Sequence, residues 1–185
     1  MSKLILISGK AEHGKTLLAN IMKKKLEIAG KRVLLFSFAA YLKFICKQYY
    51  GWDGKKDEKG RTLLQHLGTD VVRKKNPDYW VKTIYEFIET FEDEFDFFIA
   101  DDVRFENEIE YFRNIGIIDF LSIRIEREDF ENSLTEEQKN HLSETSLDNY
   151  PFDLFLLCET GVKNAERVVD ELMEYEKGIA NWLYR

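Results

Sequence analysis

The chain has 185 residues, of which 44% are hydrophobic, and this is enough to build one domain around a single buried core. Its formal net charge of -7 makes the molecule as a whole repel the phosphates of nucleic acids and of anionic membranes, so neither is an expected partner. Cys46 and Cys158 stand in apolar surroundings without the spacing of a zinc site, which predicts buried, reduced thiols. The first apolar run is too short for a signal peptide and no later run is long enough to span a bilayer, so a cytoplasmic location is expected.

Strand and helix signals alternate from the start of the chain, a pattern typical of a parallel sheet covered by helices on both faces. An apolar strand over residues 4–8 is followed by a glycine-containing loop, and apolar residues at helical spacing then continue as far as Gly30. A second strand is expected over residues 32–38 and a helix over residues 41–50. The lysine-rich residues 55–61 are predicted to form a solvated loop.

Two more helices are predicted on either side of Pro77, one with an apolar stripe over residues 63–71 and one over residues 81–88. A buried strand over residues 95–100 follows them, and a short helix is then expected over residues 106–114.

The last third of the chain begins with a predicted strand over residues 117–125. Residues 126–149 are rich in charge and contain few core residues, which makes them the candidate for a mobile lid. A last strand over residues 154–157 and a closing helix over residues 164–183 complete the chain. The expected fold class is therefore α/β, a three-layer sandwich in which helices flank a five-stranded parallel sheet, with residues 1–185 in one domain.

Residues 9–16, GKAEHGKT, match the pattern G-x-x-x-x-G-K-[ST] of a phosphate-binding loop, or P-loop, and they lie between a predicted strand and a helix. The glycines let successive backbone N–H groups point at phosphate oxygens, and the helix adds the positive end of its dipole. Lys15 is expected to lie along the β and γ phosphates of ATP, and the Thr16 hydroxyl to help hold Mg²⁺. The alternative is a glycine turn before an ordinary helix. The expected nucleotide-binding residues are Gly9, Ala11, Glu12, His13, Gly14, Lys15, Thr16 and Leu17.

The middle positions of this loop, including Glu12 and His13, need to supply only backbone groups, so no catalytic role is expected for the His13 side chain. His66 and His141 have no ligand partner at a meaningful spacing, and no metal role is expected for either.

Asp101 and Asp102 follow the predicted strand over residues 95–100, where P-loop proteins place a carboxylate next to the magnesium ion. Asp101 is therefore expected to hold the metal together with Thr16. The alternative for Asp102 is a structural one, in which its side chain caps the helix that begins after Arg104.

Transfer between two phosphates requires cations, because unit charges about 4 Å apart repel by about 4 kcal/mol at an effective dielectric constant near 20. Arginine suits this task through its planar fork of donors, although each candidate could instead form a surface ion pair. An acceptor phosphate is already anionic at pH 7, so no strong general base is needed. The arginines expected at the site follow predicted strands or helices and are Arg73, Arg104, Arg124 and Arg127.

Several stretches together resemble the deoxynucleoside monophosphate kinases of tailed phages, within the wider nucleoside monophosphate kinase-like P-loop proteins. The P-loop is common to a superfamily, whereas GRTLLQHLGTD and DDVRFENE are much narrower signals. The similarity runs through most of the chain, over residues 9–16, 37–39, 42–43, 60–70, 73, 79–81, 101–105, 107–108, 143–145 and 147–148.

The resemblance implies a transfer from ATP to a deoxynucleoside monophosphate (dNMP) that gives ADP and dNDP, with Mg²⁺ as the metal cofactor. It also implies a monophosphate-binding (NMP-binding) region at about 39–92, a lid at about 126–149, and a host cytoplasmic location for a phage protein, with a homodimer as a possible assembly. The catalytic residues would be Lys15, Asp101, Arg104, Arg124 and Arg127, and the substrate-binding residues Lys43, Asp70, Arg73, Trp80, Asp102, Arg104 and Ser143.

Alternatives remain open at this point. Without the resemblance, Trp80 would be interpreted as a helix-packing aromatic residue and Lys43 as an exposed helix lysine, and residues 143–148 could order a loop, act as a lid hinge or contact the substrate. The acceptor could instead be dephospho-coenzyme A, phosphomevalonate or a sugar acid, because a fold does not determine the acceptor. A nucleotide-dependent switch is the alternative from another class, but the N-K-x-D stretch of guanine switches does not occur in the sequence.

Overall fold

The computed structural model describes residues 2–116 and 119–174, and its centre is a sheet of five strands in the order β2-β3-β1-β4-β5. Every pair of neighbouring strands is parallel, as the alternation of strand and helix signals predicted. The strands are β1 (Lys3–Ser8), β2 (Val33–Phe36), β3 (Phe97–Val103), β4 (Asp119–Arg127) and β5 (Leu154–Cys158).

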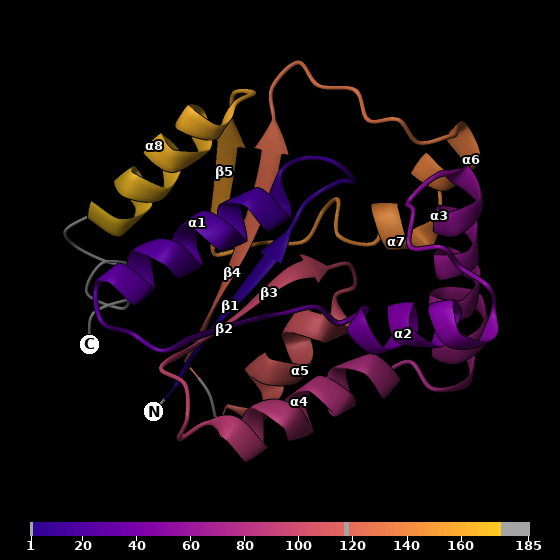
Figure 1. The fold of residues 1–185 in the computed structure, drawn as a ribbon, viewed down its shortest axis with the longest axis horizontal. Coiled ribbons are helices and arrows are strands. Elements are labelled where there is room, and N and C mark those ends of the chain that lie inside the picture. The colour runs from indigo at the N-terminus through magenta and orange to yellow at the C-terminus, as the bar shows by residue number, and fades with distance from the viewer. Residues whose placement is uncertain (1, 117–118, 175–185) are drawn as a thin grey trace.

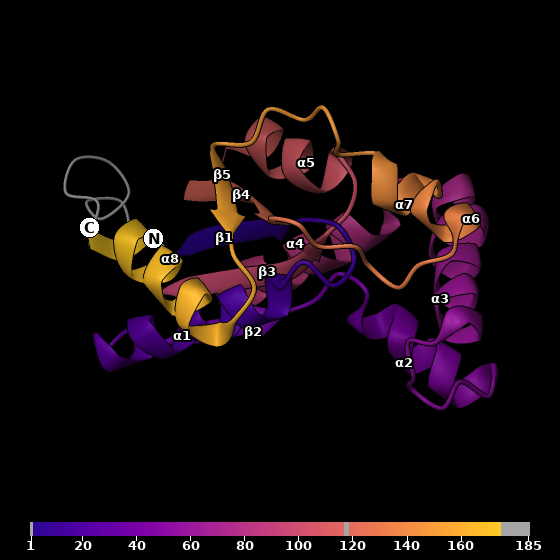
Figure 2. The same cartoon turned by 90° about the horizontal axis from the view of Figure 1, so that it is seen from above.

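Helices cover both faces of this sheet, which confirms the predicted three-layer sandwich (Figures 1 and 2). The helices α1 (Lys15–Ile28) and α8 (Val162–Glu174) pack on one face, in a core that includes Leu18, Met22 and Val169. The helices α4 (Tyr79–Phe91) and α5 (Asn107–Ile115) pack on the opposite face, in a second core that includes Ile88 and Phe112.

A third group of elements stands beside the sheet and forms one wall of the site (Figure 1). It contains α2 (Ala40–Tyr49), α3 (Glu58–Gln65) and the π-helix η1 (His66–Arg73), which share a small core around Trp52 and Trp80. The short helices α6 (Glu136–Lys139) and α7 (Leu142–Thr145) lie next to α3 in both views (Figures 1 and 2).

The sheet brings the carboxyl ends of its strands together at one edge. Ser8, the last residue of β1, is in register with Val103 of β3 and with Arg124 of β4. The loop that follows β1 therefore lies beside the acidic end of β3, where a parallel α/β sheet binds ligands.

Two expectations about the elements need correction. The residues 55–61 are not one loop, because α3 begins at Glu58, where the Asp57 side chain caps the helix by accepting a hydrogen bond from Gly60 N at 2.9 Å. The strand expected to end at residue 100 continues to Val103, so Asp101 and Asp102 lie within β3. The residues 126–149 contain few core residues, as expected, and the buried ones are Leu134, Gln138, Glu144 and Leu147.

The other predicted strands and helices are present, with bounds that differ by a few residues, where the structure describes the chain. Cys46 and Cys158 are buried free thiols. The helix expected over residues 164–183 is present as α8 up to Glu174, and its predicted continuation with Tyr175 and Ile179 lies outside the described residues, as do positions 117–118 of the fourth strand. Within residues 2–116 and 119–174, none of the helices has the length and apolar character needed to cross a membrane.

Candidate active site

The phosphate-loop motif adopts a tight turn between β1 and α1. An ideal Cβ on Gly9 would lie 2.5 Å from the backbone oxygen of Ile125, so only glycine fits this close approach to β4. Gly14 has a left-handed φ of 90° and stands at the N-terminus of α1. The loop therefore has the backbone of an anion site at the positive end of a helix dipole.

The Lys15 side chain folds back over this loop. Its residue is only 8% exposed, and Nζ donates to the carbonyl oxygens of Gly9 at 2.9 Å and Lys10 at 2.7 Å. Burial, followed by the nearby charge of Arg104, lowers the pKa of Lys15 well below its usual value. An anion in the loop would stabilise the charged form of this lysine.

Thr16 and Asp101 are in direct contact, as the motif predicted. The Thr16 hydroxyl donates to Asp101 Oδ2 at 2.6 Å, so two oxygen ligands of the kind that Mg²⁺ prefers lie together at the start of α1. Among the residues described, no group of three or more His, Cys, Asp or Glu side chains could hold a metal ion by itself. The pair fits a magnesium ion that takes its other ligands from phosphates and water.

Asp102 has a different position from Asp101 and organises the start of α2. It accepts hydrogen bonds from Phe38 N at 2.8 Å, Ala39 N at 3.2 Å and the Ser37 hydroxyl, and Lys43 Nζ lies 3.9 Å from its carboxylate. The alternative in which Asp102 caps the helix after Arg104 is therefore wrong.

Glu108, in the first turn of α5, binds the backbone that precedes this helix instead. Its Oε2 accepts from Arg104 N at 2.7 Å and Phe105 N at 3.1 Å, and its Oε1 pairs with the Arg73 guanidinium. Burial raises the pKa of Glu108, while the charge of Arg73 acts in the opposite direction. Arg73 also donates to Asn107 Oδ1 at 3.2 Å and lies over the Phe105 ring at 3.9 Å, so this arginine is held firmly in place.

Two cavities meet at this edge of the sheet. The loop cavity lies against the P-loop and is lined by Ala11, Gly14, Lys15, Thr16 and Asp101, among others. The aromatic cavity lies against α2, α3 and η1 and is lined by Phe38, Leu42, Arg73, Trp80, Phe105 and Ser143, among others. Five side chains line both cavities and so mark their boundary, and these are Lys43, Lys56, Arg61, Asp102 and Arg104.

Most of the side chains predicted to bind the substrate line the aromatic cavity. Trp80 does so while it is only 4% exposed and donates from Nε1 to Gly68 O at 3.1 Å, so it is both a packing residue and part of the wall. Asp70 does not line either cavity, because its largely exposed carboxylate faces His66 Nδ1 at 3.5 Å and His141 Nε2 at 3.8 Å.

Arg124 and Arg127 are not brought to the cavities, contrary to the sequence-based expectation. Arg124 lies within β4, is 4% exposed, and contacts the Ser8 hydroxyl at 3.4 Å and Asp148 at 3.5 Å. Arg127 donates to Glu12 O at 3.1 Å and to Thr160 Oγ1 at 2.6 Å. The two arginines therefore join β4 to the end of β1 and to the P-loop.

The side chains of Glu12 and His13 make more contacts than the expected backbone role requires. His13 Nδ1 accepts a hydrogen bond from Arg127 N at 3.0 Å, and its ring meets Phe130 edge-on. Burial lowers the pKa of His13, as do the charges of Lys15 and the arginines of β4. The neutral imidazole therefore links the P-loop to β4 through its hydrogen bond with Arg127 N.

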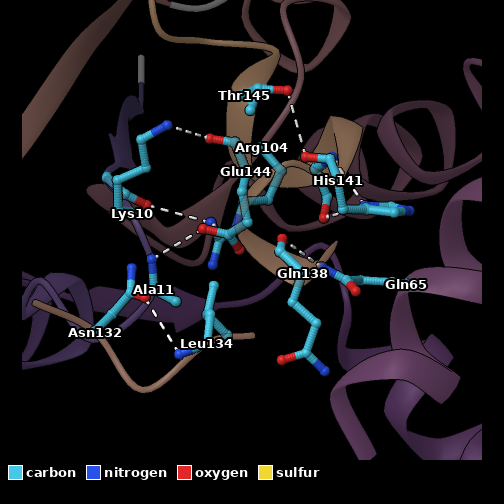
Figure 3. Close-up of polar contacts among 12 residues, drawn as sticks. Lys10, Ala11, Gln65, Arg104, Asn132, Leu134, Gln138, His141, Glu144 and Thr145 are labelled. Carbon is cyan, nitrogen blue, oxygen red and sulfur yellow. Dashed lines mark hydrogen bonds and ion pairs between the residues drawn. The ribbon is translucent and has the colours of Figure 1, made fainter. Parts of the chain in front are cut away.

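Sequence analysis missed the roles of three residues that line the cavities. Lys56 and Arg61 line both cavities, and Arg61 belongs to the GRTLLQ stretch, which was the one available signal. Glu144 of α7 accepts from Ala11 N at 3.0 Å and pairs with Arg104 at 2.7 Å, between the P-loop and the aromatic cavity (Figure 3). Lys10 Nζ donates to the backbone oxygen of the same glutamate at 2.7 Å.

The parallel sheet, the phosphate loop and the acidic end of β3 define the P-loop fold. The same fold occurs in a sugar kinase from Janibacter sp. HTCC2649, with 10% identity, a TM-score of 0.55, and coverage of 100% of this chain and 99% of that one. It also occurs in a hexameric APS kinase from Thiobacillus denitrificans, with 14% identity, a TM-score of 0.52, and coverage of 95% of this chain but 29% of that longer one. At these identities the likeness concerns the fold alone.

A family model described as deoxynucleotide monophosphate kinase matches residues 49–168, which is more than half of the chain. The chain therefore belongs to the deoxynucleotide monophosphate kinase family, and it is a nucleotide-monophosphate kinase. A search of curated proteins found no match to this sequence.

Proposed function

We propose that this kinase transfers the γ-phosphoryl group of ATP, with Mg²⁺ as cofactor, to the 5′-phosphate of a deoxynucleoside monophosphate, giving ADP and dNDP. The observation that carries this proposal is the boundary between the two cavities, which is lined by four cations and one carboxylate. A donor phosphate in one cavity and an acceptor phosphate in the other would meet there.

The loop cavity is the proposed ATP side. Its backbone amides and Lys15 would hold the β and γ phosphates, because the charge of Lys15 gains a partner when an anion enters the loop. Thr16 and Asp101 would hold Mg²⁺, which supplies a positive charge that neutralises phosphate oxygens. The side chains fix the position of the phosphates before the reaction.

The aromatic cavity is the proposed dNMP side. Its wall combines aromatic and aliphatic side chains, such as Phe38, Leu42 and Trp80, with the cations Lys43 and Arg73. A flat nucleobase fits the apolar part of such a wall and a phosphate fits the cationic part. The residues 39–92 would form the NMP-binding region and residues 126–149 a lid over it, within one domain.

The boundary cations would reduce the repulsion between the donor and acceptor phosphates. Two phosphate groups about 4 Å apart repel by about 4 kcal/mol per pair of unit charges at an effective dielectric constant near 20. Lys43, Lys56, Arg61 and Arg104 lie where this repulsion would act. Since the acceptor phosphate is already an anion near pH 7, these residues need only to draw it towards the γ-phosphate and to stabilise the charge that is transferred.

The test is an acceptor panel with γ-labelled ATP and Mg²⁺. The panel contains the four dNMPs, adenosine 5′-phosphosulfate, dephospho-coenzyme A, phosphomevalonate and a sugar acid. We expect label in at least one dNDP and none in the other products. Label in one of the other acceptors and in no dNDP would overturn the choice of substrate, and hydrolysis of ATP at a rate that no acceptor changes would indicate a nucleotide-dependent switch.

A further inference from the structure

Two carboxylates, one on each side, join residues 126–149 to the P-loop. Glu144, in this segment, accepts a hydrogen bond from the backbone N–H of Ala11 in the loop at 3.0 Å. Glu12, in the loop, accepts hydrogen bonds from the backbone N–H of Ser133 in the segment at 2.9 Å and from its hydroxyl at 2.6 Å. Each glutamate thus joins the same two parts of the chain.

Each of these glutamates also holds an arginine. Glu144 Oε1 lies 2.7 Å from Arg104 Nη1, and Glu12 Oε1 lies 2.5 Å from Arg61 Nη2. Figure 3 shows the first of these pairs, with Glu144 between Ala11 and Arg104. Arg104 and Arg61 both line the loop cavity and the aromatic cavity, so the two arginines held in this way stand at the boundary.

Glu144 is buried whereas Glu12 is partly exposed, and both carboxylates have several partners. The side chain of Glu144 is 7% exposed. Burying a carboxylate costs free energy unless hydrogen bonds and an ion pair compensate, and Glu144 has both. For Glu12, the hydrogen bonds from Ser133 are the main cause that lowers the pKa of its carboxyl, followed by the charges of Arg61 and Arg127. The lowered pKa of Glu12 favours its charged form, which pairs with Arg61.

We propose that Glu12 and Glu144 are positioning residues that set Arg61 and Arg104 at the phosphate boundary, and that they do so only while residues 126–149 lie against the P-loop. The proposal rests on the function proposed above. A guanidinium has five N–H donors, and Arg61 uses Nε towards Lys56 O and Nη2 towards Glu12, so donors remain for a phosphate oxygen. Contact of the segment with the loop would thus fix both arginines before the transfer.

A different role for Glu144 predicts the opposite behaviour. If its carboxylate only occupied the Ala11 N–H in place of a phosphate, its removal would improve nucleotide binding. The variant Glu144→Gln separates the two roles, because the amide oxygen can still accept from Ala11 N while the charge opposite Arg104 is lost.

The experiment measures kcat, the KM values for ATP and dNMP, and the affinity for ADP. The single variants are Glu12→Gln, Glu144→Gln, Arg61→Ala and Arg104→Ala. The double variants are Glu12→Gln/Arg61→Ala and Glu144→Gln/Arg104→Ala. We expect each glutamine variant to lower kcat about tenfold with KM for ATP changed less than twofold, because the arginine acts in the transition state. Each double variant should be no slower than its arginine variant alone, since the glutamate acts through that arginine. Glu171→Gln, which removes the exposed pair with Arg167 on α8, is the matched control and should leave all values unchanged.

Thermal melts of the same proteins show whether each variant is folded. If Glu144→Gln does not fold, the partly exposed Glu12 still tests the inference through Glu12→Gln. An unchanged kcat in Glu144→Gln, or losses that add fully in both double variants, would overturn the inference while the function stands. A wild-type protein that transfers no label to any dNMP would overturn the proposed function, and the inference with it.

Discussion

The charged side chains at this site are held by partners from other parts of the chain. Thr16 meets Asp101, Arg73 meets Glu108 and Arg104 meets Glu144, and each pair joins two elements of the fold. Thr16 and Asp101 could be predicted from the sequence because the P-loop motif and the end of an apolar strand specify both positions. Glu144 belongs to the stretch over residues 143–145 that resembles the kinase family, but its contacts could not be predicted, since they depend on the packing of a segment that has no periodic pattern.

Lys15→Ala should abolish phosphoryl transfer, because it removes a cation whose contact with the γ-phosphate strengthens as charge moves in the transition state. Single-turnover transfer from labelled ATP measures this directly. A variant that kept near-normal turnover would contradict the assigned role of the lysine.

Arg73→Ala should lower the free energy of unfolding by about 3 kcal/mol, because it leaves the buried Glu108 carboxylate without its ion pair. Urea denaturation measures the loss. The double variant Arg73→Ala/Glu108→Gln should recover part of the stability, and a double variant less stable than Arg73→Ala would show that charge is not the cause.

His13 should make the folded state less stable in acid. Its pKa in the fold is lowered from about 6.5, so the unfolded chain binds more protons, and the free energy of unfolding falls as the pH decreases below about 6.5. The melting temperature of the wild type should therefore drop more between pH 7.5 and pH 5.5 than that of His13→Gln, whose amide oxygen can accept from Arg127 N without titrating. Equal drops would show that His13 is not the group responsible.

The elements around the aromatic cavity depend on backbone fit as well as on apolar periodicity. The π-helix η1 follows α3 directly and ends at Arg73, so its turns set where that arginine enters the cavity. The start of α3 was not predicted because the lysines of residues 55–61 indicated a solvated loop. Asp57 and Gly60 nevertheless have the spacing of an N-terminal cap. The packing of residues 126–149 was not predicted either, because it depends partly on buried polar residues such as Gln138, which hydrophobic patterns do not reveal.

Gly60→Ala should destabilise the fold by about 1–3 kcal/mol, because an added Cβ would lie 2.1 Å from the backbone oxygen of Lys55 and 2.6 Å from Trp52 Nε1. This corresponds to a fall in melting temperature of about 2–4 °C for each kcal/mol in a chain of this size. Lys59→Ala, an exposed position in the same helix turn, is the control and should melt like the wild type. An unchanged melting temperature in Gly60→Ala would mean that α3 can shift at no cost.

For the molecule as a whole, strand order determines which residues meet. The alternation of strands and helices was sufficient to predict a parallel three-layer fold, and the adjacency of β1 and β3 places the P-loop beside Asp101. The arginine set was harder to predict, because all four candidates follow predicted strands or helices but only Arg73 and Arg104 line a cavity, while Arg124 and Arg127 do not. Charge and position in the sequence do not contain that information.

Our central claim is that the two cavities hold two nucleotides whose phosphates meet at the cationic boundary. The most direct test is calorimetric binding of a compound in which adenosine and a deoxynucleoside are joined by five phosphates. We expect one molecule per chain, bound more tightly than either ATP or dNMP, displaced by both nucleotides, and weakened in Arg61→Ala and Arg104→Ala. A compound that competed with ATP alone and bound equally well to both arginine variants would contradict the claim.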